Sequence, residues 1–336
     1  MKNYEVINRA LEEAIRQGRR EFAIYPFGKN GIETKEILNW RYGIEEAIIV
    51  DNQLSKQNTN IYSLNEVKNY NDYTWLLTCD NEKYRHEIES SISNLGIEEE
   101  NVINIFKTTE DINASEYRVL SKIGLTGNST PCKEVIEWIE RKKKEERKIV
   151  VAEIGVDIGA TAVEICKRLQ SEDEYYCFDY EDKINNLLAD LRKVPGIQCK
   201  LKGEGNSHKT LDSYNWSLCK LLFAMKEKKL NGVFDIVYLD GAHNFIHDGL
   251  ACCILKELIK KNGIFIFDDV DWSIASSPTC NPLVFPEVNN LFTEEQINDY
   301  QVERVIKAFM CNDEHFSRIY NSSPDNNGRM VFVKNQ

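Results

Sequence analysis

A glycine-spaced segment in the middle of the chain carries the clearest chemistry. Residues 151–161, Val-Ala-Glu-Ile-Gly-Val-Asp-Ile-Gly-Ala-Thr, run from a predicted strand into a predicted helix through Gly155 and Gly159. Glycines let the backbone approach a ligand closely, and a helix N-terminus offers free N–H groups. Asp179 stands twenty residues after Gly159 at the end of the next predicted strand, where an acid can accept both hydroxyls of a ribose. The pattern predicts a site for an adenosine-type cofactor.

Three carboxylates, Asp240, Asp268 and Asp269, follow two further predicted strands, 234–239 and 263–267. Open α/β sheets bind ligands at the carboxyl ends of their strands. Carboxylates that converge there repel one another unless they are protonated or bridged by a cation, and their hard oxygens suit Mg²⁺. The three acids therefore predict a divalent metal site. In the alternative interpretation, Asp268 and Asp269 cap a loop through backbone N–H groups.

His243, three residues after Asp240, is the candidate base for taking a proton from a hydroxyl group. The alternative is a structural or exposed histidine, and His247 on the same stretch is a competitor. The remaining histidines receive no role: His86, His208 and His315.

Apolar runs that alternate with helical patterns place these residues in a predicted α/β unit that begins at residue 149. Its predicted strands and helices are 149–154, 161–169, 175–178, 198–201, 234–239, 248–261 and 263–267. After a loop over 271–290, which could form a lid or a plain surface loop, come a helix near 294–311 and two strands, 316–320 and 329–333. The prediction is a sheet of seven strands.

A smaller α/β unit precedes it, with predicted strands at 22–25, 47–50, 74–78 and 102–106. Gly28, Gly31 and Asp51 repeat the nucleotide-fold spacing, but Pro26 and Asn30 break the G-x-G-x-x-G pattern. We therefore expect a degenerate Rossmann-like domain, used for packing, for dimerisation or for holding part of a nucleotide-linked substrate, rather than an active dehydrogenase. The predicted division is an accessory domain over 1–107, a helical connector over 108–148 and the larger domain over 149–336.

The order of the motifs resembles the class I S-adenosylmethionine-dependent methyltransferases. An acid precedes two glycines in Glu153-x-Gly155-x-x-x-Gly159, as in their first motif. Residues 234–243, Phe-Asp-Ile-Val-Tyr-Leu-Asp-Gly-Ala-His, and 255–269, ending in Asp-Asp, resemble two motifs of a branch that includes macrocin-type sugar O-methyltransferases. The resemblance covers residues 149–334.

The resemblance implies a role for each matched position. Glu153, Gly155 and Gly159, with Thr161 beside them, would line the methionine end of the cofactor. Asp179 would hold the ribose. The acids Asp240, Asp268 and Asp269 would hold a divalent metal that binds two hydroxyls of a sugar, with Asp240 also beside the cofactor and His243 as the base. Asn206 and Ser207 stand where the family often has Gly-Asp-Ser beside the adenine, and Ala242 and Asn262 replace the family's Asp and Pro.

Composition limits the partners. The 336 residues are 42% hydrophobic, and no apolar run reaches the length of a membrane-spanning helix. The 42 basic residues against 54 acidic ones give a net charge of −12, which disfavours nucleic acid; the basic run 141–144 is followed by two glutamates and reads as a solvated helix face. Ten cysteines without a CxxC pair fit a reducing cytoplasm.

The sequence thus predicts a cytoplasmic S-adenosylmethionine-dependent O-methyltransferase, assisted by Mg²⁺, for a hydroxyl of a sugar, a nucleotide sugar or another glycan precursor. The chain could also form a homo-oligomer. Two alternatives stay open: an NAD-dependent oxidoreductase acting on a nucleotide sugar, and a non-catalytic nucleotide-binding assembly protein.

Overall fold

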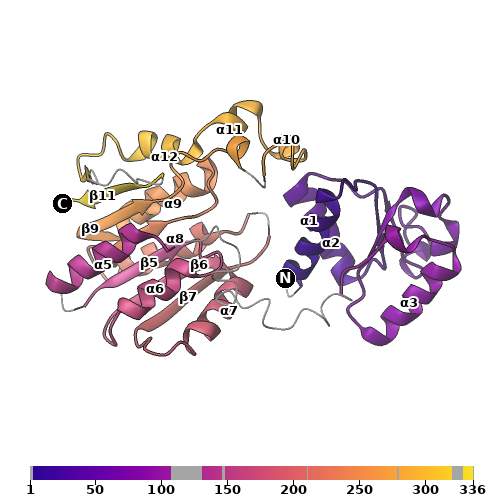
Figure 1. Ribbon diagram of the computed structural model, residues 1–336, viewed down its shortest axis with the longest axis horizontal. Helices are drawn as coiled ribbons and strands as arrows, with labels where there is room; N and C mark the ends of the chain where they lie inside the picture. Colours follow the sequence, from indigo (N-terminus) through magenta and orange to yellow (C-terminus); the bar gives the residue numbers. More distant parts are fainter. Residues whose placement is uncertain are drawn as a thin grey trace. The chain divides into compact units, whose positions relative to one another are not determined.

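The computed structural model describes residues 3–106, 131–145, 148–209, 211–277, 280–319 and 328–335. The chain divides into two compact units, Met1–Asn113 with Ile274–Ile297, and Ala114–Ser273 with Asn298–Gln336 (Figure 1). Much of the predicted connector 108–148 lies outside the described residues, and its described part contains α5, Lys133–Glu145. No helix within the described ranges is long and apolar enough to cross a membrane.

The first unit has a four-stranded parallel sheet in the order β2-β1-β3-β4. Its strands are β1 Phe22–Tyr25, β2 Ile48–Ile49, β3 Thr74–Leu77 and β4 Val102–Asn104. Its helices are α1 Tyr4–Arg16, α2 Lys29–Tyr42, α3 Glu82–Asn94, α10 Val288–Leu291 and the start of α11 Glu294–Asn298, with 3₁₀ turns at Leu54–Lys56, Leu64–Glu66, Tyr70–Asp72, Glu99–Asn101 and Ile274–Ser276.

Strand alternation builds two cores in this unit. Phe22 and Ile24 pack with residues of α1 and α2, whereas Ala23 and Tyr25 join Trp75 in a second cluster. Successive strand residues point to opposite faces, so β1 is buried on both sides, as expected of a central parallel strand.

The second unit has a seven-stranded sheet in the order β10-β11-β9-β8-β5-β6-β7. Its strands are β5 Val150–Ile154, β6 Glu174–Tyr180, β7 Lys200–Asn206, β8 Phe234–Leu239, β9 Ile259–Phe267, β10 Phe316–Ile319 and β11 Met330–Lys334. The five strands β5–β9 are parallel to one another, and β11 runs antiparallel to both of its neighbours. The predicted fold class, a seven-stranded sheet preceded by a smaller α/β unit, is confirmed.

Helices line this sheet in two sets that belong to separate hydrophobic clusters. One cluster joins α5 to α6 Ala160–Arg168 and α7 Glu181–Leu191; the other joins α8 Tyr214–Glu227, α9 Phe245–Leu258 and α12 Gln301–Phe309. Buried side chains of β5 enter the two clusters alternately, Val151 in the first and Val150 and Ala152 in the second.

The single helix predicted near 294–311 is wrong. The chain forms two helices, α11 and α12, separated by Asp299 and Tyr300. The start of α12 is fixed by Gln301, which is 5% exposed and accepts a hydrogen bond from Phe245 N at 2.9 Å. Most of the predicted lid, from Ile274 onward, belongs to the first unit.

Candidate active site

The glycine segment lies at the carboxyl end of β5, next to the end of β8. Gly155 has φ +82° and donates its N–H to Phe178 O at 2.8 Å. A Cβ at this position would lie 1.8 Å from the carbonyl oxygen of Asp240, so only glycine fits. Asp240 N in turn donates to Ile154 O at 2.9 Å. The glycine loop and the residue after β8 are therefore joined through their backbones.

The loop then turns sharply into α6. Asp157 and Gly159 also have positive φ angles, +39° and +77°, and Gly159 is the N-cap residue of α6 without a side-chain cap. Uncapped N–H groups of a first helical turn favour an anionic group. The loop thus offers a binding position for a carboxylate such as that of a methionine moiety.

Asp179, at the end of β6, closes the same loop. Its Oδ2 accepts a hydrogen bond from Val156 N at 3.0 Å, its Oδ1 accepts one from Tyr180 N at 2.6 Å, and Lys183 Nζ lies 3.9 Å away. Each carboxylate oxygen has two lone pairs, so the group retains acceptor capacity for hydroxyls while it fixes the loop.

Glu153 lies inside the sheet rather than on its edge. It is 2% exposed and its Oε2 accepts a hydrogen bond from the hydroxyl of Tyr175. Burial raises the pKa of Glu153 to about 8, although the Tyr175 hydrogen bond opposes the shift. Glu153 thus lies buried within β5, two residues before Gly155, and its predicted contact with the cofactor stays a prediction.

Three other predicted cofactor residues already have local partners. Thr161 Oγ1 accepts a hydrogen bond from Cys132 N at 3.1 Å. Asn206 Nδ2 donates to Ser207 O at 3.2 Å, and Ser207 Oγ donates to Asp212 Oδ2 at 2.6 Å. Asn206 and Ser207 therefore shape the turn that follows β7, and their roles beside an adenine also stay predictions.

His208, which received no role from the sequence, lies at the same edge as Asp179. Its ring stacks on Tyr180 with a centroid distance of 4.1 Å, and its Nε2 is 2.9 Å from Asp182 Oδ1. Burial disfavours the charge of Asp182, but the hydrogen bond and charge of His208 outweigh it and lower the pKa of this carboxyl. Neither residue belongs to a recognisable motif, so only the fold brings them together.

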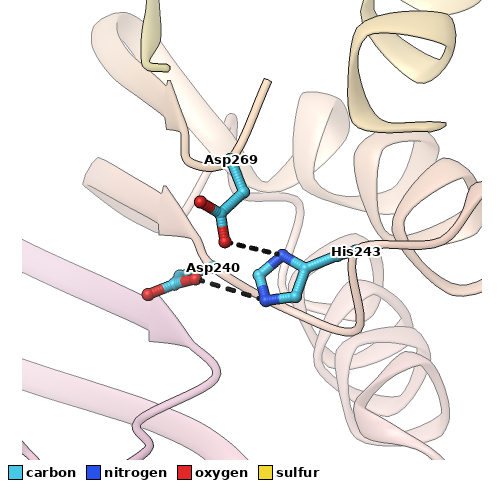
Figure 2. A group of neighbouring side chains, drawn as sticks. All are labelled: Asp240, His243 and Asp269. Atoms are coloured by element: carbon cyan, nitrogen blue, oxygen red, sulfur yellow. Dashed lines mark ion pairs between the residues drawn. The ribbon is translucent and has the colours of Figure 1, made fainter. Parts of the chain in front are cut away.

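Asp240, His243 and Asp269 form a compact cluster at the ends of β8 and β9 (Figure 2). The imidazole lies between the two carboxylates, with Nε2 3.8 Å from Asp240 Oδ1 and Nδ1 3.4 Å from Asp269 Oδ2. One ligand atom from each of the three residues lies within 4.8 Å of the others. The structure thus groups Asp240 with Asp269, as predicted, and adds His243 where the sequence placed Asp268.

Asp268 points elsewhere. Its Oδ1 accepts a hydrogen bond from Arg329 Nε at 3.0 Å, and its Oδ2 lies against the Tyr238 hydroxyl. Its side chain is 9% exposed, compared with 33% for Asp240 and 41% for Asp269. Its predicted role as a ligand stays a prediction, with its carboxylate already paired to an arginine.

Both His243 and Asp269 have a backbone conformation that is unusual for their residue types, with φ +51°. Such conformations carry strain and persist only where the surroundings hold them. Buried Asp248 supplies part of that support, since its Oδ1 accepts from Ala242 N at 3.2 Å and from Tyr214 OH at 2.5 Å. The backbone N–H of His247 donates to Oδ1 of the N-cap residue Asn244 at 2.9 Å, which places His247 in the first turn of α9, outside the cluster.

Burial and neighbouring negative charges disfavour the ionised forms of both carboxylates in the cluster. Burial and the charges of Asp268 and Asp269 raise the pKa of Asp240 well above its usual range. Burial also raises the pKa of Asp269, with Asp268 adding to the shift and His243 opposing it. A cation at this position would relieve the repulsion. Trp272, whose ring is centred 5.4 Å from that of His243, covers one side of the imidazole.

The glycine turn of the first unit is built differently. The carboxylate of Asp51 accepts backbone hydrogen bonds from Phe27 N at 3.1 Å and from Gln53 N and Leu54 N at 2.9 Å each. Asp51 thus accepts one more backbone hydrogen bond than Asp179, and the degenerate character of this domain stays a prediction.

Residues 152–270 match a family model described as a methyltransferase domain. No curated protein sequence matches the chain. Residues 152–270 contain the glycine loop, Asp179 and the Asp240–His243–Asp269 cluster. The prediction of a methyltransferase domain is confirmed for these residues; the motif branch, and with it the acceptor, is a separate question.

Solved structures with a similar fold include three methyltransferases. An O-methyltransferase from Bacillus cereus in complex with SAH has 12% identity over 74% of this chain and 97% of its own, with a TM-score of 0.41. A methyltransferase from Geobacter sulfurreducens has 11% identity over 74% and 96%, with a TM-score of 0.39. The O-methyltransferase TomG from Streptomyces achromogenes, involved in tomaymycin synthesis and bound to SAM, has 11% identity over 76% and 100%, also at 0.39. Likeness at this level carries no functional argument.

Proposed function

We propose that the methyltransferase domain of this chain transfers a methyl group from S-adenosylmethionine to a hydroxyl of a sugar, a nucleotide sugar or another glycan precursor. The proposal rests on Asp240, which connects the part of the site expected to bind the cofactor with the part expected to bind the acceptor. Its carbonyl packs on Gly155 of the cofactor loop, and its carboxylate belongs to the cluster with His243 and Asp269. A donor held by the loop and an acceptor held by the cluster would therefore be neighbours.

The cofactor half is supported by three features. The uncapped start of α6 suits the methionine carboxylate, Asp179 retains acceptor capacity for the ribose hydroxyls, and an acidic edge suits a cationic sulfonium. The sulfonium supplies an electrophilic methyl group, so the chain itself needs only to position the acceptor and remove its proton.

In the acceptor half, the carboxylates and the imidazole would have different roles. Asp240 and Asp269 would hold a divalent cation, because Mg²⁺ prefers oxygen ligands and often binds through one or two carboxylates. The cation would lower the pKa of a hydroxyl bound to it. His243, which lies between both carboxylates, would take the proton, and the two acids would stabilise the imidazolium that results.

The roles are separated by comparing three variants, His243→Gln, Asp240→Asn and Asp269→Asn. We expect His243→Gln to lower kcat by about 10²–10⁴-fold while Mn²⁺ binding persists. The two Asp→Asn variants should lose Mn²⁺ affinity and S-adenosylhomocysteine should still bind to Asp269→Asn. Methyl transfer from labelled S-adenosylmethionine to a panel of sugar nucleotides supplies the rate. Loss of Mn²⁺ in His243→Gln would make the imidazole a ligand instead of a base.

A further inference from the structure

A row of polar side chains joined by hydrogen bonds runs from Glu134 through Arg329, Asp268 and Tyr238 and ends on Asp240. Arg329, just before β11, donates from one guanidinium nitrogen to Glu134 Oε2 on α5 at 3.1 Å and from Nε to Asp268 Oδ1 at 3.0 Å. The side chains of Arg329 and Glu134 are each 12% exposed. Asp268 meets the Tyr238 hydroxyl, and this hydroxyl lies 3.0 Å from Asp240 Oδ2.

Both oxygens of Asp268 are occupied. Oδ1 accepts from Arg329 Nε and also from Asp269 N at 2.9 Å, and Oδ2 is bonded to Tyr238. Its negative charge faces the guanidinium directly, whereas among the described residues the ion pairs of Asp240 and Asp269 are with the imidazole of His243. To bind a cation, Asp268 would have to give up an ion pair in a nearly buried position, which is costly.

Tyr238 is a rigid point in this row. Its ring is 2% exposed and packs in the cluster that includes Val151 and Ile266. Because the ring cannot move without opening the sheet, its hydroxyl has a fixed position at the end of β8. It holds one oxygen of Asp240, Oδ2, and leaves the other, Oδ1, towards His243.

We infer that Tyr238 and Asp268 are positioning residues for Asp240, and that the Arg329–Glu134 pair locks them in place. Asp268 orders the Tyr238 hydroxyl and is not a metal ligand. Outer-shell partners of this kind typically contribute 10–100-fold to metal affinity. The inference rests on the proposed function, since it assumes that Asp240 and Asp269 bind a divalent cation.

The probe is Mn²⁺ alone, titrated into the full-length protein and followed by the electron paramagnetic resonance signal of free Mn²⁺. Asp240→Asn should weaken binding by about a hundred-fold or more, and Tyr238→Phe by about ten-fold. Asp268→Ala should match Tyr238→Phe. Asp268→Asn should stay within about three-fold of the wild type. The amide can accept from Arg329 and donate to Tyr238, so that the single hydroxyl proton of Tyr238, which Asp240 and Asp268 share in the wild type, is free for Asp240.

S-adenosylhomocysteine affinity and the melting temperature serve as controls, because a positioning role leaves the cofactor half intact. If Tyr238→Phe fails to fold, the Asp268→Ala and Asp268→Asn pair gives the same test. Mn²⁺ binding by Tyr238→Phe and Asp268→Ala at wild-type strength, or a loss in Asp268→Asn as large as in Asp240→Asn, would overturn the inference while leaving the proposed cation in place. A wild-type protein that binds no Mn²⁺ would overturn both.

Discussion

At Glu153 a carboxyl group is enclosed where water cannot stabilise its charge. The folded chain raises the pKa of this group to about 8, from an ordinary value of 4.5. Between these values the folded protein keeps a proton that the unfolded chain releases. The stabilisation from this group is therefore complete below about pH 4.5 and is lost as the pH rises to about 8.

The variant Glu153→Gln removes this titration and keeps an acceptor for Tyr175. Relative to the variant, the wild-type free energy of unfolding should fall by about 2–3 kcal/mol between about pH 6 and about pH 8. Urea unfolding at several pH values, without cofactor, measures the difference. Glu227→Gln, at an exposed position on α8, is the matched control. Parallel stability curves for wild type and Glu153→Gln would show that Glu153 is ionised throughout.

At the scale of the element, the end of β5 is defined by how closely it approaches β8. Gly155 combines a left-handed φ with a neighbouring carbonyl that leaves no room for a Cβ. The same approach brings the loop over Gly155–Gly159 beside the acids after β8 and β9. The conformation of this loop and its closeness to the acids are therefore set by the same pair of strands.

Gly155→Ala should destabilise the protein by about 3 kcal/mol or more, since backbone strain adds to a direct overlap with Asp240. Gly196→Ala is the matched control, because Gly196 has φ +88° but a Cβ added there would meet no atom within 4 Å. That variant should lose only about 1–2 kcal/mol. Thermal unfolding of the two variants is the measurement, and equal losses would mean that crowding at Asp240 plays no part.

The parallel strands could be predicted because their signals are local. Runs such as Phe234–Leu239 are apolar except for Asp235, and the residues that follow them reach one edge of the sheet because the strands are parallel. The pairing of Asp268 with Arg329 could not be predicted, because these residues are 61 positions apart and meet only through β11. For the same reason the sequence singled out neither His208 nor Asp248.

At the scale of the whole molecule, two α/β units carry similar strand–glycine–helix turns with different uses for the acid. Asp179 fixes its loop with acceptor capacity to spare, whereas Asp51 receives three backbone N–H groups. Residues Ile274–Ile297, which follow Asp269 closely in the sequence, belong to the first unit. Cofactor chemistry is thus expected in the second unit alone.

Asp51→Ala should destabilise the first unit by about 1–3 kcal/mol, because backbone donors lose their acceptor. S-adenosylhomocysteine affinity should stay within about two-fold of the wild type, as measured by calorimetric titration. A large loss of affinity in Asp51→Ala would place part of the cofactor site in the first unit.

Cofactor binding is measured by a calorimetric titration of the full chain with S-adenosylhomocysteine, with and without Mg²⁺, beside NADH. We predict one site for S-adenosylhomocysteine, weakened about thirty-fold or more in Asp179→Ala, and no binding of NADH. Exposed Glu227→Ala should bind like the wild type. Binding of NADH, with no binding of S-adenosylhomocysteine under either condition, would contradict the account and return attention to Gly28, Gly31 and Asp51.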